Sequence, residues 1–309
     1  MNPGRGIALK IASTFVFTLM LVCVKAVSGR IPPGEIVFAR SFFALIPIAG
    51  MLVWHGQVAS ALATQRPWQH AIRGAVGLLA MASGFVALRY LPLPEQMAIG
   101  YASPIMVVAL AAIILGETVR VYRWSAVVIG FVGILVILWP RFTLFVGGAA
   151  QGDAFLGTMV ALFGAFFGAS AAILVRSMTR TESTASIVLY FSLSASMLSL
   201  AVSLPFGWAV PSVGDAGLLV AIGLLGGVGQ IMMTTAYRYA DAATIASFDY
   251  VSMLWGVAFG YALFGEAPSV SVAVGGSIVV AAGIFIIWRE RRLGLRRKRQ
   301  REAIPAAPI

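Results

Sequence analysis

Asp249 is the acidic side chain of this sequence that is best placed to do chemistry. It lies about two turns into an apolar run over residues 242–264. A carboxylate inside a membrane helix costs about 2.5–3.5 kcal/mol on insertion scales, so it faces a cavity or a partner. We therefore expect Asp249 to bind a proton or a substrate. Ser252 follows on the same helical face. A structural ion pair, or an interfacial position for Asp249, is the alternative.

Two further polar residues lie inside apolar runs. Arg40 is a few residues into the run 36–53. A guanidinium there could hold an anionic substrate group, pair with Asp249, or extend to the lipid headgroups. Gln230 lies on one face of the run 218–237. Close helix packing explains small hydroxyls more readily than it explains this amide. Gln230 is therefore a candidate for a cavity wall.

Aromatic residues recur at matching positions of the chain. Tyr101 and Tyr250 are equivalent in a repeat described below, and Trp255 lies near the middle of its run, away from the membrane interfaces. Together they could form an adaptable wall for a planar ligand, or simply pack. Pro104 should kink the first copy, and Met253 stands at its place in the second.

The repeat joins residues 87–117 to residues 236–266, an offset of 149 without a gap. Each copy opens with Arg-Tyr and closes with Gly-Glu. We expect Glu117 and Glu266 to accept hydrogen bonds or to pair near helix ends, with transport coupling as the alternative. Lys25 and Arg176 also recur at equivalent helix ends, which indicates packing, gating or interfacial anchoring.

Composition places these residues in a membrane. The 309 residues are 60% hydrophobic and 11% charged, whereas soluble domains are about a quarter charged. A spanning helix needs about 20 apolar residues. Continuous runs of this kind favour helices over a barrel, whose strands would alternate. The ten expected runs are 6–27, 36–53, 72–88, 95–115, 124–139, 154–175, 187–205, 218–237, 242–264 and 270–288.

Several function classes are excluded by what the sequence lacks. Cys23 is the single cysteine, so a disulfide within one chain cannot form. The two histidines, His55 and His70, fall in a polar connection. The sequence has no HExxH, P-loop or GxSxG motif. We therefore predict no enzyme activity, no metal site and no cofactor.

Lysine and arginine set the expected orientation. Most of the 22 fall in connections on one side if both termini are cytoplasmic, as the positive-inside rule requires. Five helices per half then invert residues 143–288 relative to 1–142. Residues 289–309 form a basic cytoplasmic tail, expected to be disordered. The net charge of +11 reflects this bias and tail, so we predict contact with anionic lipids and not with nucleic acid.

Ten helices in two inverted repeats, with Arg40 in the second run, Pro104, and Gly116-Glu117 closing the fourth, resemble the EamA-type drug/metabolite transporters. The opening NPGRGIALK and the stretch LPLPEQMAIGYASPI are similar to a bacterial riboflavin-importer subgroup. Met253 in place of a second proline departs from the pattern. The resemblance implies a central cavity, alternating access, and helices five and ten at the periphery.

The expected function is thus an inner-membrane secondary carrier of a small organic metabolite, with protons as a further partner and a homodimer as an open alternative. Riboflavin or another planar metabolite is the first candidate. Export of amino acids, amines or drugs is the second. A membrane scaffold or regulatory subunit is the rival class.

Overall fold

The computed structural model describes residues 3–64, 66–103, 105–107, 110, 121–142, 149–178, 181–239 and 251–302. Within these ranges the chain is helical, and no strand occurs among them. The prediction of an all-α membrane fold is confirmed. The expectations for Asp249, Tyr250, Pro104 and Glu117 fall outside the described residues.

The elements follow the order of the expected runs. In the first half they are α1 (Pro3–Val27), α2 (Pro33–Phe43), α3 (Leu45–Trp54), α4 (Val58–Leu62), α5 (Pro67–Tyr90), α6 (Leu93–Gly100) and α8 (Val121–Phe142). In the second half they are α9 (Ala149–Met178), α10 (Thr184–Ser203), the short 3₁₀ turn η2 (Leu204–Phe206), α11 (Val213–Tyr239), α13 (Val251–Phe264) and α14 (Val270–Glu302).

Six of these helices are long and apolar enough to cross a bilayer: Gly4–Val27, Pro33–Trp54, Pro67–Tyr90, Gly152–Val175, Thr184–Ser203 and Val213–Ala236. The second of them joins α2 to α3. The fourth and ninth expected runs pass through residues that are not described. The fifth and tenth contain shorter apolar stretches in α8 and α14. The total of ten spans stays a prediction.

Prolines explain where several helices begin and where one is interrupted. Pro33, Pro67 and Pro94 stand in the first turns of α2, α5 and α6, where the missing N–H costs nothing. Pro47 lacks the N–H that would bond to the carbonyl of Phe43, and the expected second run accordingly divides into α2 and α3 at this point.

The end of the chain differs from expectation. The sequence predicts a disordered basic segment from residue 289, but α14 continues through it to Glu302. Arginine, lysine, glutamate and leucine are good helix formers, so a helix that leaves the membrane can continue into a basic stretch without apolar periodicity.

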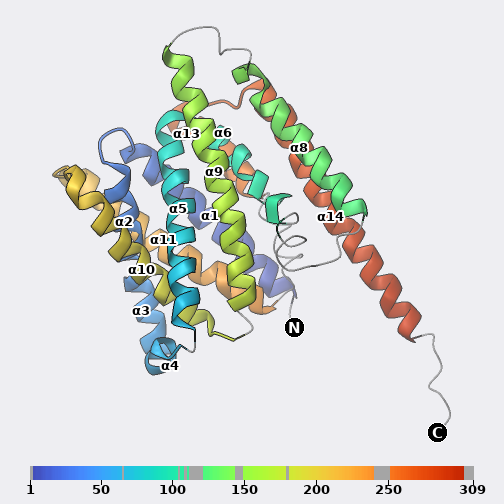
Figure 1. The fold of residues 1–309 in the computed structure, drawn as a ribbon, viewed down its shortest axis with the longest axis horizontal. Helices are drawn as coiled ribbons and strands as arrows, with labels where there is room; N and C mark the ends of the chain where they lie inside the picture. Colours follow the sequence, from blue (N-terminus) through green and yellow to red (C-terminus); the bar gives the residue numbers. More distant parts are fainter. Residues whose placement is uncertain are drawn as a thin grey trace.

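The two halves pack reciprocally (Figure 1). By the sequence offset, α1 corresponds to α9, α2 to α10, α5 to α11 and α8 to α14, while α6 and α13 lie in the equivalent fourth and ninth runs. α1 packs mainly on α11, and its equivalent α9 packs on α5; α2 packs on α10, α6 on α13, and α8 on α14. The repeat therefore relates the α1–α11 contact to the α9–α5 contact, and it relates the α2–α10 and α8–α14 contacts to themselves. Figure 1 shows α8 and α14 side by side at one side of the molecule.

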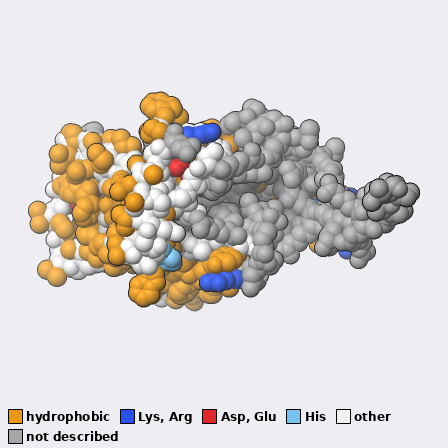
Figure 2. All heavy atoms as spheres, turned by 90° about the horizontal axis from the view of Figure 1, so that it is seen from below, with side chains coloured by type: hydrophobic (Ala, Val, Ile, Leu, Met, Phe, Trp, Pro, Cys, Tyr) orange, Lys and Arg blue, Asp and Glu red, His pale blue; other side chains and the backbone are white. Residues whose placement is uncertain are grey.

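Large apolar side chains cover much of the described surface, as Figure 2 shows in one view. Phe163, Met197, Val202 and Leu254 are among those at least half exposed. Soluble proteins rarely expose so much contiguous apolar area. In a bilayer the same side chains contact lipid tails.

Candidate functional site

Polar residues that the sequence predicts on separate helices meet at one end of the bundle. Lys25, in the last turn of α1, donates from Nζ to the carbonyl oxygens of Leu88 (3.1 Å) and Leu91 (2.7 Å) and lies 3.3 Å from Glu266 Oε1. Glu266 Oε2 accepts a hydrogen bond from the backbone N–H of Leu93 at 2.8 Å. We call this group the Lys25–Glu266 contact. It ties α1 and the α5–α6 corner to the segment after α13.

Gly265 accounts for the position of that carboxylate. Its φ of +65° lies in the left-handed region, which a residue with a Cβ rarely adopts. The backbone turns there, α13 ends, and Glu266 leaves the helix axis toward Lys25. The Gly-Glu pair at the close of the repeat thus has a geometric reason: glycine ends the helix, and glutamate joins it to the other half.

Tyr101 and Ser252 are also brought together. Their hydroxyls lie 2.7 Å apart across the α6–α13 contact. On α13, the ring of Trp255 meets that of Phe15 edge-on, with centroids 5.3 Å apart, and its Nε1 is buried without a hydrogen-bond partner. Gln230 is buried on α11. Arg176 lies near the end of α9, and its side chain is outside the described part.

Arg40 does not extend to the headgroups. It is 4% exposed, and its guanidinium carbon lies 5.4 Å from the ring centre of Phe191 on α10. Arg73 of α5, 7% exposed, approaches the same ring, at 4.2 Å. We call these residues the Arg40–Phe191–Arg73 cluster. Nε and Nη1 of both arginines are buried and make no hydrogen bond to the described residues.

The cluster lies deep in the membrane span. Arg40 is seven residues into α2, or about 10 Å at 1.5 Å per residue. Arg73 is six residues into α5, or about 9 Å at 1.5 Å per residue. This depth is measured from the opposite end of the bundle, because α5 starts at the end where α3 finishes. Each central arginine costs at least about 2.5 kcal/mol. A cation–π contact returns only about 0.5–2 kcal/mol, so the contacts with Phe191 offset part of the cost.

Sequence reasoning missed Arg73. The positive-inside argument assigns Arg73 to a cytoplasmic connection, because the third expected run starts at residue 72, whereas Pro67 starts α5 five residues earlier. The repeat carried a usable signal, because Gly74 and Gly77 align with Gly223 and Gly226 at the same offset of 149. Lys10, also counted there, is buried within α1.

These glycines let helices approach around the cluster. A Cβ at Gly77 would overlap Arg73 and Phe191, and a Cβ at Gly226 would lie 3.0 Å from Arg40 Nε. The equivalent glycines therefore leave room for the two guanidinium groups at the seam between the halves.

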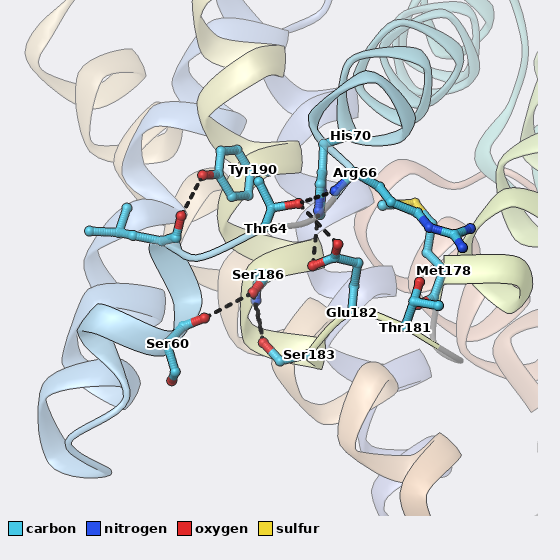
Figure 3. A network of polar contacts seen from close by, with 11 residues as sticks. Ser60, Thr64, Arg66, His70, Met178, Thr181, Glu182, Ser183, Ser186 and Tyr190 are labelled. Carbon is cyan, nitrogen blue, oxygen red and sulfur yellow. Dashed lines mark hydrogen bonds and ion pairs between the residues drawn. The ribbon is translucent and has the colours of Figure 1, made fainter.

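A polar network closes the end of the bundle near the start of α5 and α10 (Figure 3). Glu182 accepts a hydrogen bond from Thr64 Oγ1 at 3.0 Å, and its other oxygen lies 3.6 Å from His70 Nε2. That separation suits an ion pair with a protonated imidazole but is too long for a hydrogen bond. His70 also packs on Tyr190, with ring centroids 4.6 Å apart.

At the opposite end of these helices, Arg30 donates to Asp215 at 2.7 Å. The hydrogen bond with Asp215 raises the pKa of the Arg30 guanidinium above its ordinary value. Glu35 Oε1 accepts from the backbone N–H of Ala209 at 2.6 Å. Glu35, Asp215 and Glu182 thus each have partners of their own.

Duplicated helical halves with buried charge at their seam define a polytopic membrane protein of the transporter kind. A profile of the EamA-like transporter family matches the chain twice, at residues 4–139 and 155–289. The protein belongs to this family and is a small-metabolite transporter.

Curated relatives cover most of the chain. The pseudopaline exporter CntI of Pseudomonas aeruginosa is 28% identical over 286 residues, 91% of this chain and 95% of that protein. The S-adenosylmethionine uptake transporter of Rickettsia prowazekii is 27% identical, covering 93% and 94%. The riboflavin transporter of Rhizobium johnstonii is 29% identical, covering 75% and 74%. One solved crystal structure, 19% identical, matches with a TM-score of 0.67 over 94% of this chain and 99% of its own, which shows the fold alone.

Proposed function

We propose that this protein is a secondary carrier that moves a small organic metabolite across the bacterial inner membrane by alternating access, without ATP. The observation that carries the proposal is the reciprocal packing of the halves: α1 lies on α11 as α9 lies on α5. Two bodies joined in this way can rock about their seam and open a central site to one side at a time.

The proposed topology has both termini in the cytoplasm. Residues 1–142 and 143–288 then form the two inverted repeats, and the basic segment 289–309 lies against anionic headgroups. In that orientation the Lys25–Glu266 contact closes the outer end of the bundle. The Glu182 network closes the inner end.

Two substrate classes are supported by separate observations. Trp255, Phe15 and Tyr101 supply aromatic surface on α1, α6 and α13, which favours a planar metabolite such as riboflavin, the substrate named for one relative. The buried Arg40 and Arg73 favour an amino-acid-like metabolite. The relatives include an exporter and uptake transporters, so both directions enter the test.

Asp249 is our candidate for proton coupling, on the argument from the cost of a carboxylate within an apolar run. We expect no catalytic step on the substrate, because the chain has none of the hydrolase motifs.

The test is transport by the purified chain in proteoliposomes. Labelled riboflavin, S-adenosylmethionine and a set of amino acids and amines are assayed for uptake and efflux, with and without a pH gradient. We expect saturable transport of at least one compound, and loss of gradient-driven accumulation in Asp249→Asn if protons are coupled. A chain that moves none of the panel in either direction contradicts the carrier and favours a scaffold.

A further inference from the structure

We propose that Arg40 and Arg73 form an anion-binding subsite within the apolar spans of the bundle, and that the transported metabolite carries a carboxylate which both guanidinium groups bind. This inference rests on the proposed carrier function and adds a substrate class to it.

The first argument is that the cluster has two like charges and, among the described residues, no acidic partner. Both guanidinium carbons lie within 5.4 Å of one ring centre, so they are separated by less than the sum of their two distances to it. Two positive charges at such a short separation repel each other, and burial strengthens the repulsion. Phe191 supplies only weak compensation. An anion bound between the arginines offsets both their mutual repulsion and the cost of burying their charges.

The second argument is that three described carboxylates at the ends of these helices have other partners. Glu35 binds the N–H of Ala209, Glu182 binds Thr64, and Asp215 binds Arg30. No ion pair between these acids and Arg40 or Arg73 occurs in the described ranges. The orphaned N–H donors are therefore available to a group that comes from outside the chain.

A third argument is where the unpartnered donors gather. In the described part of the chain, the buried side-chain atoms without a hydrogen-bond partner belong to α2, α5 or α10, except for Gln96 Oε1 and Trp255 Nε1. Ser41 and Ser192, which follow Arg40 and Phe191 directly, are among them. A site that binds and releases a polar ligand needs donors that the protein itself leaves unsatisfied.

The geometry selects a carboxylate. Guanidinium is planar and matches the two oxygens of a carboxylate. Arg40 approaches the ring from one end of the bundle and Arg73 from the other. A group bound between them therefore stays in contact with at least one arginine whichever end opens. Gly77 of α5 and Gly226 of α11 leave the space that the two arginine side chains occupy, since a Cβ at either glycine would crowd them.

Binding is tested on the full-length chain in lipid nanodiscs, from the thermal unfolding midpoint in sodium acetate, succinate or phosphate against sodium chloride at equal ionic strength. A ligand of the folded state raises the midpoint with its concentration. We expect acetate or succinate to do so, with the rise at least halved in Arg40→Gln and in Arg73→Gln and absent in the double variant. Arg73→Lys keeps the charge without the planar fork and should retain part of the rise.

The control is Arg89→Gln, which removes an exposed cation at the end of α5 and should keep the full rise. The inference is overturned if the carboxylates act no differently from chloride, or if the rise survives in the double variant. A rise with phosphate alone overturns the carboxylate assignment. An internal counter-ion is indicated, and the subsite rejected, if Asp249→Asn restores the stability lost in Arg40→Gln.

Transport distinguishes this inference from the carrier function beneath it. For a transported compound with a carboxylate, its methyl ester should move about tenfold more slowly in the wild type, and Arg73→Gln should erase that difference. If only uncharged compounds are transported, and neither arginine affects their transport, the subsite is rejected and the carrier function is retained. Anion binding without transport of any compound supports the subsite and contradicts the carrier function.

Discussion

Lys25→Met should open the end of the bundle that the Lys25–Glu266 contact closes. The substitution keeps an apolar stem and removes the ammonium, with its two carbonyl hydrogen bonds and its ion pair. Hydrogen bonds to charged groups contribute about 1.5–3 kcal/mol each. The two side chains are 17% and 19% exposed, so water replaces part of what is lost and the low end applies. Two bonds at that end give about 3 kcal/mol, or about two orders of magnitude in the opening equilibrium.

The assay is labelling of a cysteine by a membrane-impermeant maleimide. Gln96→Cys, one turn into α6 beyond the contact, is placed in a Cys23→Ser background, which leaves one thiol. If labelling requires opening, its rate rises with the open population. We expect an increase of about 100-fold in Lys25→Met and little change in Arg89→Gln, which removes a cation at the same end.

A cycle with Glu266→Gln tests the pairing itself. This substitution keeps an acceptor for the N–H of Leu93 and removes the charge, so its effect should be smaller than that of Lys25→Met. Residues in contact are non-additive by about 0.5–3 kcal/mol, and the double variant should resemble Lys25→Met. Equal labelling of Lys25→Met and Arg89→Gln, or strictly additive effects, refutes the reasoning.

Two further predictions concern packing. Tyr101→Phe and Ser252→Ala each remove the hydrogen bond between the two hydroxyls, so each should lower the free energy of unfolding by about 0.5–1.5 kcal/mol. The double variant should lose less than the sum of the single effects; additive losses in chemical denaturation would contradict the contact. Gly223→Ala places a Cβ 2.8 Å from the carbonyl of Ala39 and should cost about 1–3 kcal/mol by overpacking, whereas Gly50→Ala on α3 meets no atom within 4 Å and should be neutral or slightly stabilising. Equal thermal midpoints for the two alanine variants would count against the close approach of α2 and α11.

Local patterns predict the helices well and the contacts between them poorly. The apolar runs place α1, α5, α10 and α11 within a few residues, since length and hydropathy decide whether a segment spans the bilayer. The recurrence of Gly265-Glu266 at the repeat's end also identifies a helix end. That Glu266 meets Lys25, far away in the sequence, depends on how the halves dock.

Arg73 shows the limit of charge counting. The positive-inside rule treats a cation near a run's edge as part of a connection, and a shift of five residues in the start of α5 moves it into the membrane interior. Its partner Phe191 has no polar signal at all. A ring that contacts two guanidinium groups is visible only once three helices are in place.

Equivalent glycines lie at the seam in both halves, but the side chains that pack on them differ. Gly74 packs on Ser194 of α10, and its equivalent Gly223 packs on Phe43 of α2. A Cβ at Gly223 would meet the Cα and Cβ of Phe43 and the carbonyl oxygen of Ala39, whereas a Cβ at Gly74 would meet only the side chain of Ser194. We therefore expect the two contacts to respond unequally to a tilt of one half against the other. For the proposed rocking motion, we expect such unequal contacts to favour one resting state of the carrier over the other.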